Sequence, residues 1–561
     1  MNTFTKPYLF IIIFLICGLI SRQGNSQVVF EPSYRTVNAY LYRLAQKGVI
    51  DLNDVVMPLS RTYIMTQLDF LAKHRNQLTP LEREELEFYQ KDYTLEKNLS
   101  HLPSSDSALV SFLQKEENGR ERFFTYQNSQ FSFNLQPIIG LQLENAQNTT
   151  FNQRWIGAWA YGYLGKNISF SADFRNSQLN NIPTGYDFNK SFSPEPGRVG
   201  DVSEKKYDYS LINASITASW KWGSFTFGKN YLPVGYGTSG KLILSDKAPS
   251  FPHIRLDANP AKWVSFMYAH AWLNSNVIDS NTFHSTSVPS RLQYQYQAKY
   301  LAIHTLTLKP IKGLSLMLGE STIYNDRIQI AYLIPVALFT GLSHYLGEAG
   351  ATSANSVTTN TISNSQMFVQ LSSRNHIKNT HLYATFFNDE FEFNTLFGNS
   401  DVMNARNHTA YQLGASVADF PIRNLQLTLE YTRIRPFAYV HFVPGQTYKS
   451  NDFNMGHWLG PNASQLFAQA HYRVIRGLNL RFIYEYIRKG TEGSGLQQTS
   501  SQNIYPFLWG SVKEYSDFQA RLQYELTHDL FITLNSKFEN IKSEDKVRRM
   551  YNFSCGINYG F

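Results

Sequence analysis

Charged and planar side chains gather at the end of an alternating segment, residues 425–432, and in the stretch that follows it. Glu430 lies on the polar register of that segment, and Arg433 and Arg435 come next. The following stretch adds further polar and planar groups, namely His441, His457, Trp458 and Asn462. Carboxylate, amide and guanidinium groups bond sugar hydroxyls and uronate carboxylates, and aromatic rings stack on sugar faces. This group therefore predicts a glycan-binding site.

A second set of charged residues, Asp246, Lys247 and Arg255, lies earlier in the chain and offers the same kind of chemistry. Both sets have a structural alternative, in which the charged groups only satisfy one another. The sequence leaves this alternative open for each of the residues named.

Sequence motifs of cofactor binding, hydrolysis and metal binding are either absent or lie in a context that does not fit them. Gly235, Gly237 and Gly240 match the Gly-x-Gly-x-x-Gly fingerprint, but that fingerprint must open a helix and residues 241–244 have an extended pattern. We expect a loop there instead of a dinucleotide site. Gly-x-Ser-x-Gly and His-Glu-x-x-His are absent, and the 14 histidines show no metal-ligand spacing. The sequence predicts a protein that is not an enzyme and has no cofactor and no metal site.

The last strand of the chain shows what kind of scaffold must position these groups. Tyr551, Phe553, Cys555, Ile557 and Tyr559 share one register, and small or polar residues occupy the other. A two-residue period indicates a β-strand whose faces meet different media. A soluble sandwich strand is one interpretation, but it seldom carries an apolar stripe to a frayed end. The closing strand of an outer-membrane barrel would set that stripe against lipid.

The composition agrees with a transmembrane antiparallel β-barrel. Aromatic residues make up 15% of the chain, with 35 Tyr and 40 Phe, and charged residues only 17%. Alternation dilutes each apolar face with polar lumen residues, so a mean hydropathy of −0.32 is compatible with a barrel. The net charge of +8 comes without a cluster of Lys and Arg, so we expect no nucleic-acid partner.

The N-terminal residues have the pattern of a secretory signal. Lys6 precedes an apolar run at residues 8–20, which is too short to span a bilayer. Small residues at 24 and 26 predict cleavage before Gln27, so residues 1–26 are the expected signal peptide. Cys17 would leave with it, and Cys555 alone could form no intramolecular disulfide. Export of a barrel predicts the outer membrane of a Gram-negative cell.

The first part of the mature chain has a helical pattern. Gly48 stops a helical stretch at residues 33–47, and Ser60 caps a second. Thr79, Pro80 and Glu82 combine an N-cap, a proline at the first helical position and a capping box. We therefore expect a periplasmic helical bundle and linker over residues 27–121 and the barrel over residues 122–561.

Connections between the alternating segments are of two kinds. Eight short ones, rich in Gly, Asn or a basic residue, lie at 165–167, 223–224, 259–262, 310–313, 375–379, 421–424, 475–477 and 527–529. Between them run long polar stretches at 176–206, 274–290, 343–364, 391–408, 445–462 and 490–512. Outer-membrane barrels alternate short periplasmic turns with long external loops, so eight turns give 18 strands. Counting alone allows 16 to 20.

Several short motifs, in this order, are similar to those of the Wzi capsule-assembly family. They are Met57-Pro58-Leu59-Ser60-Arg61, Phe225-Thr226-Phe227-Gly228-Lys229-Asn230, Gly235-Tyr236-Gly237, Leu242-Ile243-Leu244-Ser245, Gly319-Glu320-Ser321, Glu430-Tyr431-Thr432-Arg433 and His457-Trp458-Leu459-Gly460-Pro461-Asn462. The resemblance runs from about residue 33 to residue 561. It implies an 18-stranded barrel with a periplasmic helical bundle and a lectin-like protein that retains exported polysaccharide at the cell surface.

The expected partners are therefore a capsular or extracellular polysaccharide, outer-membrane lipid and the polysaccharide export machinery. The alternative function is an outer-membrane porin or a gliding-motility-associated surface protein. One departure from the resemblance is residues 329–346, whose apolar run at 331–339 is long for an external loop. We expect this segment to pack inside the barrel mouth as a plug or lid.

Overall fold

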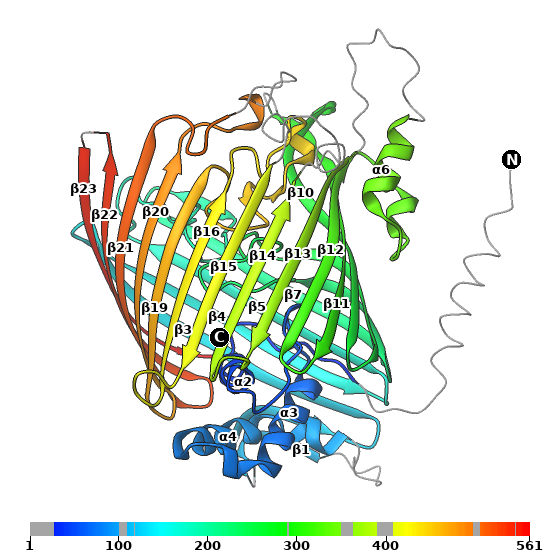
Figure 1. Ribbon diagram of the computed structural model, residues 1–561, viewed down its shortest axis with the longest axis vertical. Coiled ribbons are helices and arrows are strands. Elements are labelled where there is room, and N and C mark those ends of the chain that lie inside the picture. Colours follow the sequence, from blue (N-terminus) through cyan, green and yellow to red (C-terminus); the bar gives the residue numbers. More distant parts are fainter. Residues whose placement is uncertain are drawn as a thin grey trace, which may run out of the picture.

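The computed structural model is a closed barrel with a group of helices at one end (Figure 1). It describes residues 27–99, 109–116, 118–288, 291–348, 363–389, 408–497, 505–544 and 546–560. The predicted signal peptide lies outside the described residues. Among the residues described, no helix is both long enough and apolar enough to cross a membrane.

The helices of the N-terminal region form a small bundle with its own core of Leu41, Leu44, Ile64, Leu68 and Leu86. The predicted capping box is confirmed, because the Thr79 hydroxyl accepts from the Glu82 N–H and the Glu82 carboxylate accepts from the Thr79 N–H. The helices of the bundle are α2 (Thr36–Gln46), α3 (Arg61–Lys73), α4 (Pro80–Asp92) and α5 (Thr94–Asn98), with the 3-10 turn η1 (Arg75–Gln77). Later in the chain, the connections between strands contain α6 (Phe339–Glu348) and the 3-10 turns η3 (Ile330–Leu333), η5 (Pro444–Gln446) and η6 (Gly495–Gln497).

The barrel is a ring of 18 antiparallel strands, as predicted. It closes where the last strand pairs with the first, from Tyr559 opposite Ile139 to Asn552 opposite Ala146. The ring consists of β3 (Phe131–Ala146), β4 (Thr149–Leu164), β5 (Ile168–Asn180), β7 (Lys206–Trp220), β8 (Gly223–Asn230), β9 (Phe251–Ala261), β10 (Val264–Ser285), β11 (Leu292–Ile311), β12 (Leu314–Asn325), β13 (Ser363–Arg374), β14 (Thr380–Asn388), β15 (Thr409–Ala418), β16 (Leu425–Ile434), β19 (Ala463–Ile475), β20 (Leu478–Gly490), β21 (Val512–Thr527), β22 (Leu530–Ser543) and β23 (Lys546–Tyr559).

Short strands lie beside this ring or inside it. The hairpin of β1 (Leu109–Lys115) and β2 (Glu121–Gln127) pairs with the start of β3, and β6 (Gly200–Ser203) pairs with β7. Two-residue strands β17 (Lys449–Ser450) and β18 (Phe453–Asn454) form a small ladder within the loop between β16 and β19.

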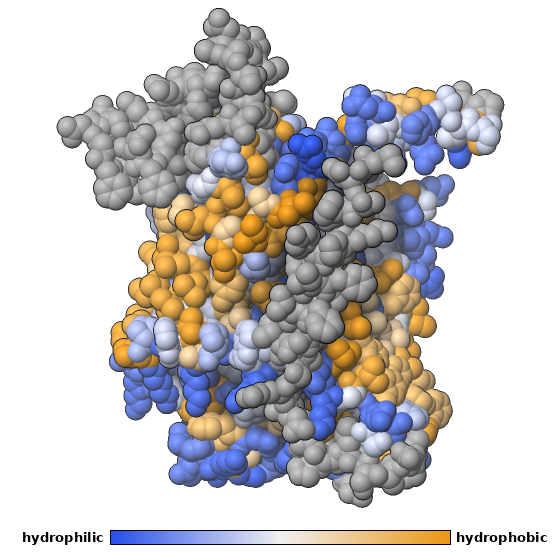
Figure 2. All heavy atoms as spheres, turned by 90° about the vertical axis from the view of Figure 1, so that its right-hand side faces the viewer, coloured by the Kyte–Doolittle hydropathy of each residue, from blue (hydrophilic) through white to orange (hydrophobic). Residues whose placement is uncertain are grey.

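The two faces of the barrel wall differ as the alternation predicts. On β23, Tyr551, Phe553 and Ile557 are at least half exposed on the outer face, whereas the inward Ser554 is 9% exposed. Figure 2 shows hydrophobic side chains over the middle of the wall and hydrophilic ones gathered at its lower end. Since closed barrels are one of the two structures that can satisfy every backbone group in lipid, this exterior is that of a membrane-spanning barrel.

Each of the eight predicted short connections lies at or beside a turn between neighbouring strands, at the end where the helices lie (Figure 1). The one predicted at 223–224 is displaced, because β8 already begins at Gly223 and the turn is formed by residues 221–222. One long stretch was predicted wrongly. Residues 274–290 are largely strand, because β10 continues to Ser285 and β11 begins at Leu292, so the two extend as a hairpin beyond the rim. Polar residues can continue a strand pair there because both faces meet water.

The connection between β8 and β9, residues 231–250 (the plug loop), enters the lumen. Leu242, Ile243 and Leu244 have no exposed surface, and Val234 and Leu244 form a β-bridge. The loop rests on the bundle through a second bridge, between Val234 and Val56, and the Ser245 N–H donates to the Met455 carbonyl above. Non-helical backbone at residues 241–244, with Leu244 as its single β-bridge residue, therefore stands where a dinucleotide site needs a helix.

Residues 329–346 do not plug the mouth, and that prediction is wrong. The segment lies on the outer wall, where α6 stands beside β12 (Figure 1). Its Tyr332 and Phe339 are buried against outward residues of β10–β12, and the Phe339 N–H donates to the Glu320 carboxylate at 2.6 Å. The opposite side exposes Ile330, Val336 and Leu338 by more than 70%. An apolar run can pack against lipid outside the barrel or against other residues in its lumen, and the sequence does not distinguish these two positions.

The register of β23 can be tested with one pair of substitutions. We expect Phe553→Lys to reduce barrel assembly far more than Asn552→Lys, because a lysine on the lipid face costs about 2–4 kcal/mol at mid-bilayer and little in the lumen. The measurement is the yield of heat-modifiable barrel on cold electrophoresis. Equal yields from the two variants would show that the two faces are wrongly assigned.

Candidate functional site

Glu430, on the inward face of β16, holds the plug loop against the wall. Its carboxylate accepts from the Thr238 N–H at 2.5 Å and the Ser239 N–H at 2.7 Å, and the Tyr383 hydroxyl also donates to it. The side chain is 1% exposed. The Glu430 carboxylate is therefore occupied by two backbone donors and one side-chain donor, in keeping with the structural alternative.

Trp458, His457 and His441 are also buried beneath the loops. The Trp458 indole N–H donates to the Ser239 carbonyl at 2.7 Å, so this ring fastens the plug loop from above. His457 has no exposed surface and packs against Gly240, where a side chain would collide with it. His441 is 4% exposed, and its Nδ1 accepts from the Val443 N–H. The three rings therefore shape the inner surface of the loops.

Asn462 joins two external loops at the top of β19. Its amide donates to the carbonyls of Glu492 and Trp509, both at 2.8 Å, and its Oδ1 accepts from the Trp509 N–H at 3.1 Å. The residue has no exposed surface. Since all these partners are backbone groups, Asn462 fixes the conformation of the segment at residues 505–510.

Around that segment, arginines and aromatic rings form what we call the rim cluster: Arg433, Arg435, Phe437, Tyr505, Phe507 and Trp509. The Arg433 guanidinium stacks over the Phe507 ring, 3.9 Å from its centre. The Tyr505 and Trp509 rings lie 4.4 Å apart. Arg435 is exposed, and Tyr505, Phe507 and Trp509 are half-buried. Planar donors and partly exposed rings thus share one surface at the loop end of the barrel.

The structure therefore divides the predicted group in two. Arg433 and Arg435 belong to the rim cluster, whereas the other members lie beneath the surface and support it. The three rings of the cluster at 505, 507 and 509 are not among the predicted residues, because the stretch 490–512 has the composition of a polar loop. Their spacing of two residues was the available signal.

The second predicted set is spread over the lumen. Asp246 is exposed on the plug loop, and the Lys247 ammonium donates to the carbonyls of Lys190 and Glu195. Arg255 is on β9, where its guanidinium pairs with Asp257 at 2.8 Å and covers the Phe30 ring. Arg255 lies against the bundle in a different cavity, so these residues do not form one site.

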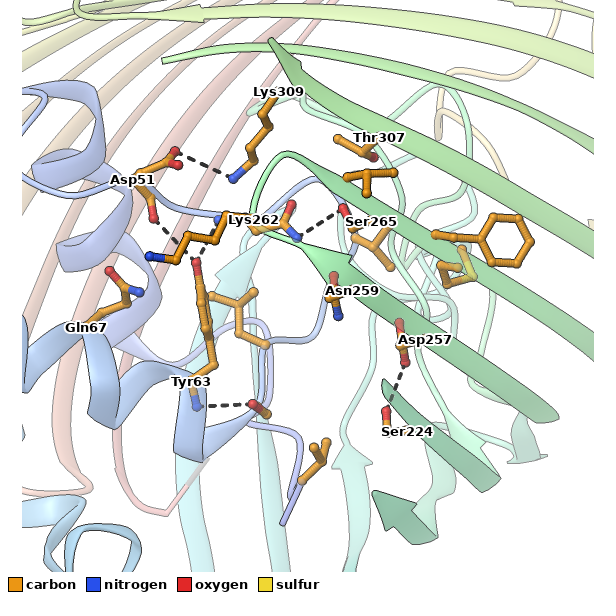
Figure 3. Close-up of a pocket in the computed structure, with 18 of the residues that line it drawn as sticks. Asp51, Tyr63, Gln67, Ser224, Asp257, Asn259, Lys262, Ser265, Thr307 and Lys309 are labelled. Atoms are coloured by element: carbon orange, nitrogen blue, oxygen red, sulfur yellow. Dashed lines mark hydrogen bonds and ion pairs between the residues drawn. The ribbon is translucent and has the colours of Figure 1, made fainter. Parts of the chain in front are cut away.

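That cavity, which we call the lower cavity, separates the bundle from strands β8–β11 and has a volume of about 660 Å³. Figure 3 shows its two sides, with Asp51, Tyr63 and Gln67 on the bundle and Asn259, Lys262, Ser265, Thr307 and Lys309 on the barrel. Ser265 and Thr307 are on inward registers, in line with the lumen residues Met267 and Ile303. The cavity therefore belongs to the lumen side of the wall.

The bundle is fastened to the barrel by a buried ion network, the floor network, centred on Asp92. Its carboxylate lies 2.9 Å from Arg120, 3.1 Å from Arg35, 3.4 Å from Arg122 and 3.5 Å from Arg61. Arg35 and Arg120 also pair with Asp529, in the turn between β21 and β22. Burial alone would raise the pKa of Asp92, but the arginines, Arg120 first, hold that pKa well below its usual range.

Within the described residues, no three His, Cys, Asp or Glu side chains are grouped so that they could hold a metal ion.

Comparison with known proteins gives one family and a set of similar folds. Residues 162–552 match the family described as Capsule assembly protein Wzi. Wzi of Escherichia coli, described as an outer-membrane protein involved in group 1 capsule assembly and a carbohydrate-binding β-barrel, has a TM-score of 0.55 at 11% identity, covering 96% of this chain and all of that one. OprD of Pseudomonas aeruginosa has a TM-score of 0.41 at 11% identity, covering 76% of this chain and 94% of its own. No curated protein sequence matches.

Proposed function

Because this chain belongs to the Wzi capsule-assembly family, we propose that it binds an exported capsular or extracellular polysaccharide and helps to attach it to the cell surface. The resemblance expected from the motifs is thereby confirmed. The fold shared with E. coli Wzi, which is described as binding carbohydrate, supports the proposal.

The observation that carries the proposal is the rim cluster at the loop end of the barrel, where Arg433 continues the outward register of Leu429 and Tyr431. Guanidinium groups can bond carboxylates and hydroxyls in pairs, and partly exposed rings can stack on sugar faces. Asn462 bonds the backbone of Trp509, so this part of the cluster is set in place before a ligand arrives, which lowers the entropic cost of binding.

The filled lumen disfavours the porin alternative. Porins of 16–18 strands leave an aqueous channel, whereas here Leu242, Ile243 and Leu244 of the plug loop are fully buried inside the barrel. The plug loop, the loop at residues 435–462 and the bundle are bonded to one another across the lumen.

We place the bundle in the periplasm and the rim cluster outside the cell, because membrane barrels have short periplasmic turns and long external loops. The bundle lies at the end with the short turns (Figure 1). Signal cleavage before Gln27, the domain limits 27–121 and 122–561, a contact with the export machinery and the lack of a catalytic role remain predictions.

The proposal is tested by Arg433→Ala together with Arg435→Ala. We expect the double variant to fold, because neither side chain is fully buried. It should move polysaccharide from the cell surface into the medium and weaken purified glycan binding by about tenfold or more, since hydrogen bonds to charged groups contribute about 1.5–3 kcal/mol each. The measurements are cell-bound against released polysaccharide and direct binding.

A matched control is Arg548→Ala with Arg549→Ala, two exposed arginines on β23 away from the rim cluster. This control should retain polysaccharide normally. Normal retention by the folded Arg433 and Arg435 variant would remove those residues from the site. If the unaltered protein bound the glycan as strongly at high salt as at low salt, charge would not contribute to binding, and aromatic stacking would be the remaining explanation.

A further inference from the structure

We propose that the lower cavity is a second saccharide site, selective for an acidic sugar unit such as a hexuronate. The inference rests on the proposed function and extends it, because this site lies at the bundle end of the barrel. A cavity of about 660 Å³ is large enough for a few linked sugars.

The lining is rich in groups that bond hydroxyls. Amides and hydroxyls enter from both sides, namely Asn53, Gln67, Asn259, Ser265, Thr305 and Thr307. Only some of them bond each other, such as Asn53 with Ser265 at 3.2 Å. In Figure 3, Gln67 and Asn259 face the cavity without a bond to another residue drawn. Convergent amides and hydroxyls are the groups that orient a sugar.

The charge of the lining favours an acidic ligand. It contains Arg255, Lys262, Lys309 and Lys312 against only two carboxylates, Asp51 and Asp257. Both carboxylates already have a cationic partner, because Arg255 pairs with Asp257 and the Lys309 ammonium lies 3.5 Å from the Asp51 carboxylate. Among the described residues, Lys262 and Lys312 have no carboxylate within 4 Å. Lys262 extends across the cavity towards Tyr63 and Gln67 (Figure 3).

Aromatic rings on the bundle side complete the site. Tyr63 is held in place because its hydroxyl accepts from the Asn53 N–H at 2.9 Å. Phe70, which also lines the cavity, is 42% exposed and stacks on His74. An exposed ring beside free amides and an ammonium group is the combination that grips an acidic sugar.

The position of the cavity argues against a phospholipid headgroup as its ligand. Ser265, Thr305 and Thr307 point to the lumen, and the lipid-facing residues of the same strands, such as Phe266 and Leu306, lie on the other side of the wall. An acyl chain would have to pass through a closed strand ladder to reach the cavity.

The test uses purified full-length protein with Arg433→Ala and Arg435→Ala, so that binding at the rim does not contribute. Calorimetric titration with a tetramer of galacturonate should show binding, and the neutral maltotetraose should bind at least tenfold more weakly. Lys262→Glu, in the same background, should weaken galacturonate binding at least tenfold. Gln67→Glu, on the bundle side of the cavity, should do the same.

Lys166→Glu is the matched control, because Lys166 is an exposed lysine in another short turn on the same end of the barrel. It should leave binding unchanged. Absence of galacturonate binding, equal binding of maltotetraose, or unchanged binding by the folded Lys262 and Gln67 variants would overturn the proposal. Competition by phosphatidylglycerol micelles would assign the cavity to lipid instead. These outcomes are independent of surface retention, which tests the rim cluster alone.

Discussion

Replacing Asp92 by alanine should loosen the helical bundle from the barrel while leaving the barrel itself folded. The substitution removes the one carboxylate that Arg35, Arg61, Arg120 and Arg122 share. It leaves four buried guanidinium groups with only their outer partners, which are Glu31, Glu96, Glu116 and Asp529. Breaking a buried ion network in this way costs about 3–5 kcal/mol. Limited proteolysis of the bundle, followed beside heat-modifiable migration of the barrel, measures the two parts separately.

Asp69→Ala is the control on the same bundle, because Asp69 forms only an exposed pair with Lys97 at 3.8 Å, which should contribute about 0–1 kcal/mol. The folded-state pKa of Asp92 is depressed, so its stabilisation is present above the unfolded value of about 3.9 and is lost as the pH falls through the folded value. The bundle of the natural protein should therefore loosen only below about pH 4. Equal protease resistance of the Asp92 variant and the natural protein would contradict the role of the floor network.

The intact protein should show little steady conductance in planar bilayers, and opening it should require removal of internal segments. We expect a Gly-Ser linker in place of residues 232–247, combined with Asp92→Ala, to raise the steady conductance well above that of the intact protein, with the loop at residues 435–462 still restricting it. The linker removes the buried Leu242, Ile243 and Leu244, and the second change loosens the bundle below. An 18-stranded ring without its contents is wide enough for water.

Deletion of residues 329–346 is the informative control, because that segment lies on the outer wall. It should leave conductance near that of the intact protein, provided that the variant is inserted. A large stable conductance of the unaltered protein would favour the porin alternative and count against the proposed function.

Features that depend on local sequence could be predicted well. The two-residue period of β23 and the Gly, Asn and basic residues of the short turns depend on neighbouring residues, so strand faces and strand number followed from them. The capping box at Thr79 and Glu82 is equally local, since its two bonds span three residues.

Features that depend on distant partners could not be predicted. Glu430 has the chemistry of a sugar ligand, yet it bonds backbone groups almost 200 residues away in the chain. The position of residues 329–346 depends on His304 and Glu320, which point outwards from the barrel wall and bond to the backbone of this segment. The sequence alone does not show that these two side chains point outwards. The polarity of a side chain indicates whether it needs an apolar or a polar environment, but a barrel offers several places of each kind.

The contacts of the bundle also order the events of folding. The Phe88 carbonyl accepts from His528, Glu85 pairs with Arg473, and the Arg374 guanidinium reaches Asp54. These partners come from turns and strands spaced around the ring, including the penultimate connection of the chain. The helices that are synthesised first can therefore complete their contacts only after the turn between β21 and β22 is in place. A fully seated bundle thus reports a ring assembled as far as the β21–β22 turn, and a chain lacking that turn would leave Phe88 without this contact.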